Sequence, residues 1–157
     1  MVRSSTALAA QLSRSWRELG AVLASRRLLA SIGNPADVRL TPTKLRALDF
    51  IAERGGVRIG DLAAGVFVDE TTATRLVDRL EAMGVAARVP VLGDRRGTEV
   101  VLTAEGERLA ADMAERRQAF FREVLEALEP AERAELVRLS AKATASLHER
   151  AREAVAR

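Results

Sequence analysis

Apolar residues recur every three or four positions over most of the chain, which is the spacing of amphipathic α-helices. Residues 5–32 carry such a stripe through Leu12, and the Gly-Asn-Pro sequence at 33–35 supplies a stop signal. The same spacing returns near the other end, over residues 103–128 and in a segment that begins at Pro130. The pattern therefore predicts long helices at both ends of the chain.

The middle of the chain predicts three shorter helices, each marked by its end signals. Thr41 is a good N-cap in front of a proline, and the Gly-Gly pair at 55–56 ends that helix. A short helix over residues 60–66 follows. The third helix begins behind Asp69, another N-cap, and closes at Gly84. This third helix shows the clearest separation of an apolar face from a polar one.

After Gly84 the periodicity changes from that of helices to that of strands. Val85–Leu92 and Thr98–Leu102 are rich in Val and Leu, and residues 93–97 between them are Gly-Asp-Arg-Arg-Gly. This arrangement predicts a β-hairpin with an arginine-bearing tip. The expected fold class is therefore mainly α with a small β-hairpin.

The order of these elements indicates a winged helix-turn-helix. Two short helices, a helix bearing hydroxyls and arginines, and a hairpin make up this lobe, which we assign to residues 38–102. We expect residues 1–37 and 103–157 to form helical dimerisation arms. A chain of 157 residues suits one domain with an oligomerisation arm.

The composition excludes several classes of function. The chain has no Cys, so disulfides, thiolate metal sites and cysteine nucleophiles are ruled out. His148 is the single histidine, and neither paired carboxylates nor a phosphate-cradling glycine loop is evident. We therefore predict no enzyme activity, no metal site and no cofactor. No apolar run is long enough for a membrane span, and charges interrupt the N-terminal region, so we expect a cytoplasmic protein.

The helix behind Asp69 carries the groups that DNA requires, whereas the net charge of +3 is weak evidence by itself. Its polar face holds small hydroxyls and arginines, among them Thr71, Thr74, Arg75 and Arg79. These groups suit phosphates and base edges in the major groove, and arginines at a hairpin tip suit the narrow minor groove. The alternatives are an ordinary solvated helix face and an ordinary charged turn. The combination in this order favours DNA binding.

The same residues resemble those of a known family, the MarR-type (multiple antibiotic resistance regulator) transcriptional regulators. Three stretches carry the resemblance: LTPTKLRALDFIAERGG, DLAAGVFVDETTATRLVDRLEAMG and GDRRGTEVVLTAEG. It covers roughly residues 8–150, with the helices in the same order. The resemblance implies double-stranded DNA as a partner. It also implies a homodimer whose interface is formed by the first helix and the last two.

The resemblance assigns residues to the DNA interface. Asp94 would hold the wing in place and leave Arg95 or Arg96 for the minor groove or for phosphates. The full set expected at DNA is Thr41, Thr43, Glu70, Thr71, Thr72, Thr74, Arg75, Arg79, Asp94, Arg95 and Arg96. Two positions depart from the family pattern. Gly60 stands where a Ser or Thr usually caps the helix, and Glu70 would repel phosphate unless it accepts from a cytosine amino group.

The function implied is that of a repressor, acting as a homodimer on a pseudo-palindromic operator and released by a ligand. The effector expected is a small aromatic or anionic molecule, bound where the first helix and the dimerisation arm meet the DNA-binding lobe. Trp16 would pack in the dimer or line that pocket, and four arginines are available to an anion: Arg14, Arg17, Arg26 and Arg27. The alternative is an architectural or constitutive DNA-binding regulator without a small-molecule switch.

Overall fold

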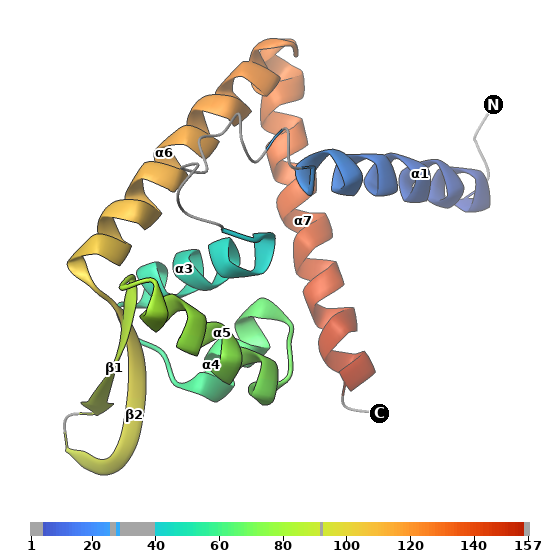
Figure 1. Ribbon diagram of the computed structural model, residues 1–157. Helices are drawn as coiled ribbons and strands as arrows, with labels where there is room; N and C mark the ends of the chain where they lie inside the picture. The colour runs from blue at the N-terminus through green and yellow to red at the C-terminus, as the bar shows by residue number, and fades with distance from the viewer. Residues whose placement is uncertain (1–4, 26–27, 29–39, 92, 156–157) are drawn as a thin grey trace. The chain divides into compact units, whose positions relative to one another are not determined.

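The computed structural model describes residues 5–25, 28, 40–91 and 93–155, with the side chains at 94–96 and 151–155 outside that description. In chain order the elements are α1 (Ser5–Leu23), α3 (Pro42–Arg54), α4 (Ile59–Val66), α5 (Glu70–Ala82), β1 (Ala86–Val91), β2 (Asp94–Leu102), α6 (Ala104–Glu126) and α7 (Pro130–Val155) (Figure 1). The chain divides into two compact units, residues 1–116 and 117–157. The expected class, mainly α with one small hairpin, is confirmed.

Helix α1 is shorter than the pattern predicted. It ends at Leu23 rather than continuing to residue 32. Two residues further on, the Ser25 hydroxyl accepts the backbone N–H of Leu28 at 3.2 Å. A serine that binds the main chain three residues ahead competes with the helical hydrogen bonds, which explains the break. The expected stop signal at 33–35 lies outside the described residues.

Helix α3 has the two ends that the sequence predicted. The Thr41 hydroxyl accepts the backbone N–H of Lys44 at 3.3 Å, and Pro42 occupies the first helical position. Gly55 ends the helix in the left-handed region, with φ of 74°. The buried face consists of Leu45, Ala47, Leu48 and Ile51, whereas Ala52 is exposed.

Helix α4 starts one residue earlier than expected. Its N-cap is Arg58, whose side chain makes no capping hydrogen bond, so the expectation that Gly60 caps this helix is wrong. The helix ends at Phe67, a non-glycine residue with φ of 59°. Helix α5 follows directly, and its predicted cap, Asp69, is confirmed. Together α4, this turn and α5 form the helix-turn-helix.

The hairpin is longer on its second strand than the sequence suggested. The expected strands at 85–92 and 98–102 are Ala86–Val91 and Asp94–Leu102 in the structure. The strands are antiparallel, and Pro90 pairs with Thr98 whereas the next residue, Val91, pairs with Asp94. Residues 95–97 therefore form a bulge on β2, next to the turn at Gly93. A bulge of this kind bends a strand and redirects its side chains.

The apolar core gathers α3, α4 and α5 against the base of the hairpin. Its fully buried side chains include Leu48, Ile51, Leu62, Leu80 and Val100. Val57, between α3 and α4, pairs with Val100 of β2 through two backbone hydrogen bonds of 3.0 and 2.8 Å. This pairing fastens the hairpin to the helices, so the polar face of α5 is presented by a rigid lobe.

Helix α6 begins directly behind Thr103, the first residue of the helix predicted over 103–128. The Thr103 hydroxyl accepts the N–H of Gly106 at 3.1 Å and donates to the Gly84 carbonyl at 2.7 Å. The helix ends at Glu126, two residues before the expected end, and α7 starts at Pro130 as predicted. None of the helices in the described residues is both long and apolar enough to cross a membrane.

Candidate nucleic-acid interface

Helix α5 has one face in the core and one in solvent. Ala73, Leu76, Val77 and Leu80 are buried. The residues predicted to contact DNA all lie on the exposed side: Glu70, Thr71, Thr72, Thr74, Arg75 and Arg79. Because residues three and four apart share a helical face, the buried stripe leaves this polar set in solvent. The structure thus presents as one surface the six residues that the sequence assigned to this helix.

Asp69 holds the N-terminal turn of α5. Its Oδ1 accepts the backbone N–H of Thr72 at 2.8 Å, and its Oδ2 accepts the Thr72 hydroxyl at 2.7 Å. These hydrogen bonds, led by the one from the side chain, lower the pKa of Asp69 below its ordinary value of 3.8. The cap is therefore ionised at neutral pH and fixes the turn from which Thr71 and Thr72 project.

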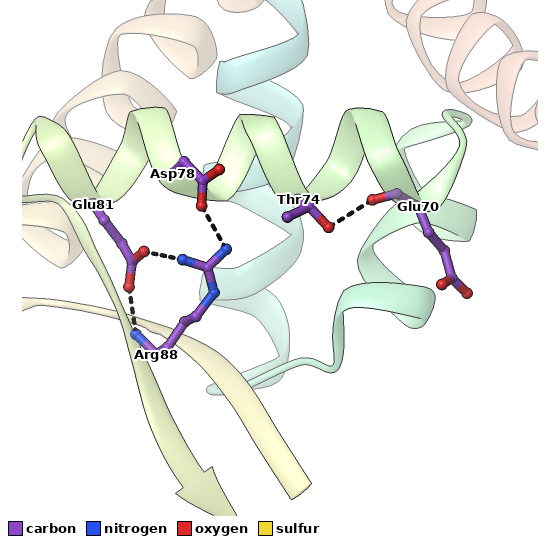
Figure 2. A network of polar contacts seen from close by, with 5 residues as sticks. All are labelled: Glu70, Thr74, Asp78, Glu81 and Arg88. Carbon is purple, nitrogen blue, oxygen red and sulfur yellow. Dashed lines mark hydrogen bonds and ion pairs between the residues drawn. The ribbon is translucent and has the colours of Figure 1, made fainter.

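Two threonine hydroxyls of α5 already donate their protons within the protein. Thr72 donates to Asp69, and Thr74 donates to the backbone carbonyl of Glu70 at 2.8 Å (Figure 2). A hydroxyl whose proton is used in this way still accepts hydrogen bonds. Adenine and cytosine present amino donors in the major groove. In this arrangement the two threonines suit those bases.

The charged groups of α5 fall into two sets. Arg75 and Arg79 are exposed, and neither is paired with a carboxylate anywhere in the described part of the chain. Asp78 and Glu81, in contrast, are both bound by Arg88 of β1 (Figure 2). The cations of this helix remain available to an incoming anion, while the two carboxylates of its C-terminal half share one arginine, which offsets part of their charge.

Arg88 is the residue that the sequence analysis missed. Its Nη2 lies 2.7 Å from Asp78 Oδ1, its Nη1 pairs with Glu81 Oε2, and its backbone N–H donates to Glu81 Oε1 at 2.9 Å. The available signal was two acids three residues apart on the polar face of a helix, followed across a tight turn by an arginine on a strand. Hairpin and helix are joined by these contacts.

The carboxylate of Glu70 lies close to Gly60, at the start of α4. A methyl group placed on Gly60 would lie 3.2 Å from Glu70 Oε1, so the carboxylate lies against the first turn of α4. The free N–H groups of a helix start favour a nearby negative charge. The lack of a side chain at Gly60 therefore makes room for Glu70 rather than supplying a cap.

The remaining predicted residues lie at the start of α3 and on the wing. Thr41 is exposed and Thr43 is half-exposed. Asp94 lies in β2 beside the turn, and Arg95 and Arg96 lie in the bulge, but their side chains are outside the described part of the structure. In the described residues there is no group of three His, Cys, Asp or Glu side chains that could hold a metal ion.

Comparison with known proteins gives a family for this lobe. Residues 40–97 match the model of the MarR family. The uncharacterized HTH-type transcriptional regulator YsmB of Bacillus subtilis is 31% identical over 87 residues, which are 55% of this chain and 60% of YsmB. The chain therefore spans less than two thirds of the length of that relative.

Solved structures match over most of the chain. A MarR family protein from Bacillus stearothermophilus is 27% identical, with a TM-score of 0.76 over 91% of this chain and 97% of its own. BpsR of Bordetella bronchiseptica is 26% identical, with a TM-score of 0.60 over 81% of this chain and 98% of its own. That structure is described as showing how 6-hydroxynicotinic acid regulates DNA binding by BpsR.

Proposed function

This chain is a MarR-type winged helix-turn-helix protein, and we propose that it regulates transcription by binding double-stranded DNA sequence-specifically. The outward face of α5 carries the proposal, because Arg75 and Arg79 lack carboxylate partners in the described chain while Arg88 occupies the nearby acids. A helix of this kind enters the major groove, where arginine binds guanine and phosphate. YsmB, one of the similar proteins, is named as a transcriptional regulator.

In the proposed complex, α5 reads bases from its N-terminal half. Thr71, Thr74 and Arg75 approach base edges, since the first turns of a recognition helix lie deepest in the groove. Arg79 lies one turn beyond Arg75 and contacts the phosphate backbone. Glu70 stays with the first turn of α4 and does not enter the groove, which removes the repulsion that its position in the sequence suggests.

The other contacts in the proposed complex position the protein on the duplex. Thr41 and Thr43, at the start of α3, bind phosphates through hydroxyl and backbone donors. Arg95 and Arg96 reach the minor groove or its phosphates from the bulge on β2, and Asp94 holds that end of the wing. A narrow minor groove has an enhanced negative potential, which favours arginine there.

We further propose that the protein acts as a homodimer. Leu8, Leu12, Trp16 and Leu19 of α1 are between 40% and 55% exposed, and Leu136, Leu139 and Leu147 of α7 are 43–47% exposed. Apolar stripes of this length on a single chain are typical of a subunit interface. A second copy of the chain is the natural cover, and two-fold symmetry then pairs two recognition helices with a pseudo-palindromic operator.

The proposed mode of action is repression relieved by a small aromatic or anionic molecule. The similarity to BpsR, whose DNA binding is regulated by 6-hydroxynicotinic acid, supports an effector of that chemical class. Arg14 and Arg17 are exposed on α1 and offer guanidinium groups to a carboxylate. A ligand that binds one spacing of the two lobes better than the other shifts the population away from the DNA-binding form.

The deciding experiment is selection of duplexes from a random library by the purified protein, followed by gel shifts on the selected and a scrambled duplex. We expect a two-fold motif and a specificity ratio of at least ~1,000 at physiological salt. Equal binding to every duplex, with extended coating, would instead identify an architectural protein. Release of the selected duplex by phenolic and carboxylic acids tests the effector.

A further inference from the structure

Arg88 belongs to β1 of the wing and makes three contacts with α5. Its guanidinium binds Asp78 at 2.7 Å and also pairs with Glu81, and its backbone N–H donates to Glu81 at 2.9 Å (Figure 2). The Arg88 and Glu81 side chains are only 30% and 31% exposed. A partly buried, charge-assisted cluster holds its geometry better than an exposed surface pair does.

The Arg88 contacts bridge the short turn between α5 and β1. Helix α5 ends at Ala82 and β1 starts at Ala86, so a turn of three residues separates the recognition helix from the wing. A turn of this length can bend, and the Arg88 contacts lie on both sides of it. They therefore set the angle between the helix that enters the major groove and the strand that leads to the wing.

The same contacts place one positive charge against two negative charges of the recognition helix. Asp78 is 57% exposed on the side of α5 that carries Arg75 and Arg79. An unpaired carboxylate there would repel DNA phosphates, since like charges near a protein surface still interact strongly at short distances. With Arg88 in place, the charge of Asp78 and Glu81 together is halved from within the protein.

We infer that Arg88 is a positioning residue for DNA recognition, whose guanidinium binds the protein rather than DNA. It makes the recognition helix and the wing a single rigid unit, so that major-groove and wing contacts are formed together in one register on the operator. This inference rests on the proposed function. It assigns selectivity to a residue that belongs to neither of the surfaces that touch DNA.

The test uses the full-length dimer, the duplex selected by the parent from a random library, and a scrambled duplex of equal length. The variants are Arg88→Met, Glu81→Gln and the double variant. Arg108→Met is the matched control, because Arg108 pairs with Glu105 at 2.6 Å on exposed α6 and its loss changes the net charge equally. Binding is measured over a range of salt concentrations, with thermal unfolding recorded alongside.

If Arg88 acts through the carboxylates, Arg88→Met lowers affinity for the selected duplex about tenfold and for the scrambled duplex much less. Glu81→Gln also lowers affinity for the selected duplex, although it makes the protein more positive. In the double variant the loss is smaller than the product of the single losses, because Glu81 no longer carries an uncompensated charge and only Asp78 does. Arg108→Met binds like the parent.

Two results would overturn the inference. Equal loss on both duplexes, with a salt slope reduced by about one unit per subunit, would identify Arg88 as a direct phosphate ligand. If the parent discriminates between the duplexes and Arg88→Met binds both as the parent does, the Arg88 cluster has no role in DNA recognition. If the parent protein binds the selected and the scrambled duplex equally, the proposed function itself is wrong. That result is obtained before any variant is measured.

Discussion

Single residues at two helix starts determine the local geometry of the DNA-facing lobe. Asp69 fixes the first turn of α5 through Thr72. At Gly106, in the first turn of α6, an added Cβ would lie 1.9 Å from the Val85 carbonyl oxygen. One position needs a side-chain acceptor and the other needs the absence of a side chain, so alanine is tolerated poorly at both.

The Asp69 cap gives a pH dependence of defined sign. Because folding lowers the pKa of Asp69 below 3.8, its contribution to stability is fully present above that value and is lost as the pH falls through the lower folded pKa. Asp69→Ala should therefore be less stable than the parent at neutral pH, and the difference should shrink below about pH 3.8. Urea unfolding at several pH values checks this. Asp69→Asn, which caps without ionising, should differ from Asp69→Ala by an amount nearly independent of pH in that range.

Gly106→Ala should destabilise the protein strongly. The new methyl group would collide with backbone rather than with a flexible side chain, so the start of α6 has to move. We expect the free energy of unfolding to fall by about 3 kcal/mol, measured by denaturant titration. Gly20→Ala on α1 is the control, since no atom lies within 4 Å of its added Cβ, and it should be neutral or stabilising by up to ~1 kcal/mol. Parent-like stability of Gly106→Ala would show that the contact is not tight.

At the scale of elements, the recognition helix and the wing have different tasks. Helix α5 presents side chains from a continuous, capped frame. The wing presents Arg95 and Arg96 from a bulge between the Pro90–Thr98 and Val91–Asp94 pairs. The first arrangement suits contacts to bases, and the second suits contacts to the backbone and minor groove. Substitutions in the two elements should therefore differ in kind and not only in size.

Arg75→Ala and Arg96→Ala should separate these tasks. If Arg75 reads a base edge, its loss weakens operator binding by ~1–3 kcal/mol and spares random DNA. Loss of Arg96 should weaken binding to both duplexes and reduce the salt slope by about one unit per subunit. Arg75 is exposed and Arg96 belongs to the bulge of the hairpin, so thermal unfolding should be unchanged. Parent-like binding by Arg96→Ala on both duplexes would contradict the wing assignment.

At the scale of the whole molecule, the exposed apolar side chains on α1 and α7 call for a partner. The DNA-binding lobe has its own core, around Leu48, Ile51 and Leu80, which is complete within one chain. No side chain of α1 is buried among the described residues. These uncovered apolar faces support the proposed homodimer.

Charges placed on the apolar stripe of α1 should break that dimer. Leu12→Asp with Leu19→Asp puts four carboxylates in the interface of two chains, and we expect dimerisation to weaken at least ~100-fold by analytical ultracentrifugation. The control carries the same charges at Ala10 and Ala21, which are exposed on the opposite side of the helix. If both variants stay dimeric at micromolar concentration, α1 does not form the interface.

A symmetric dimer also predicts the geometry of the operator. Two recognition helices that meet the same face of the duplex need half-site centres one helical turn apart, ~10 bp. Footprinting of the selected duplex should show two such half-sites. Inserting about 5 bp between them should abolish tight binding, because the second half-site then faces away, whereas inserting about 10 bp keeps its face. An asymmetric footprint over one half-site would contradict reading by a dimer.

The sequence by itself determined what depends on residues within about four positions of each other. The caps at Thr41, Asp69 and Thr103 and the stops at Gly55 and Gly84 were all predictable, because each acts on the adjacent turn of its own helix. The polar face of α5 was equally predictable, because the 3.6-residue period alone separates it from the buried face. The fold class and the main candidate surface followed from these local rules.

Only the tertiary structure decided the contacts between segments that are distant along the chain. Arg88 meets Asp78 and Glu81 across a turn, Glu70 lies against Gly60, and Val57 pairs with Val100. The register of β2 and the start of α4 depend on such neighbours, which is why the strand limits and the Gly60 cap were predicted wrongly. Periodicity specifies which side of an element faces the core, but it does not specify which residues of another element lie opposite, because that depends on how the whole lobe packs.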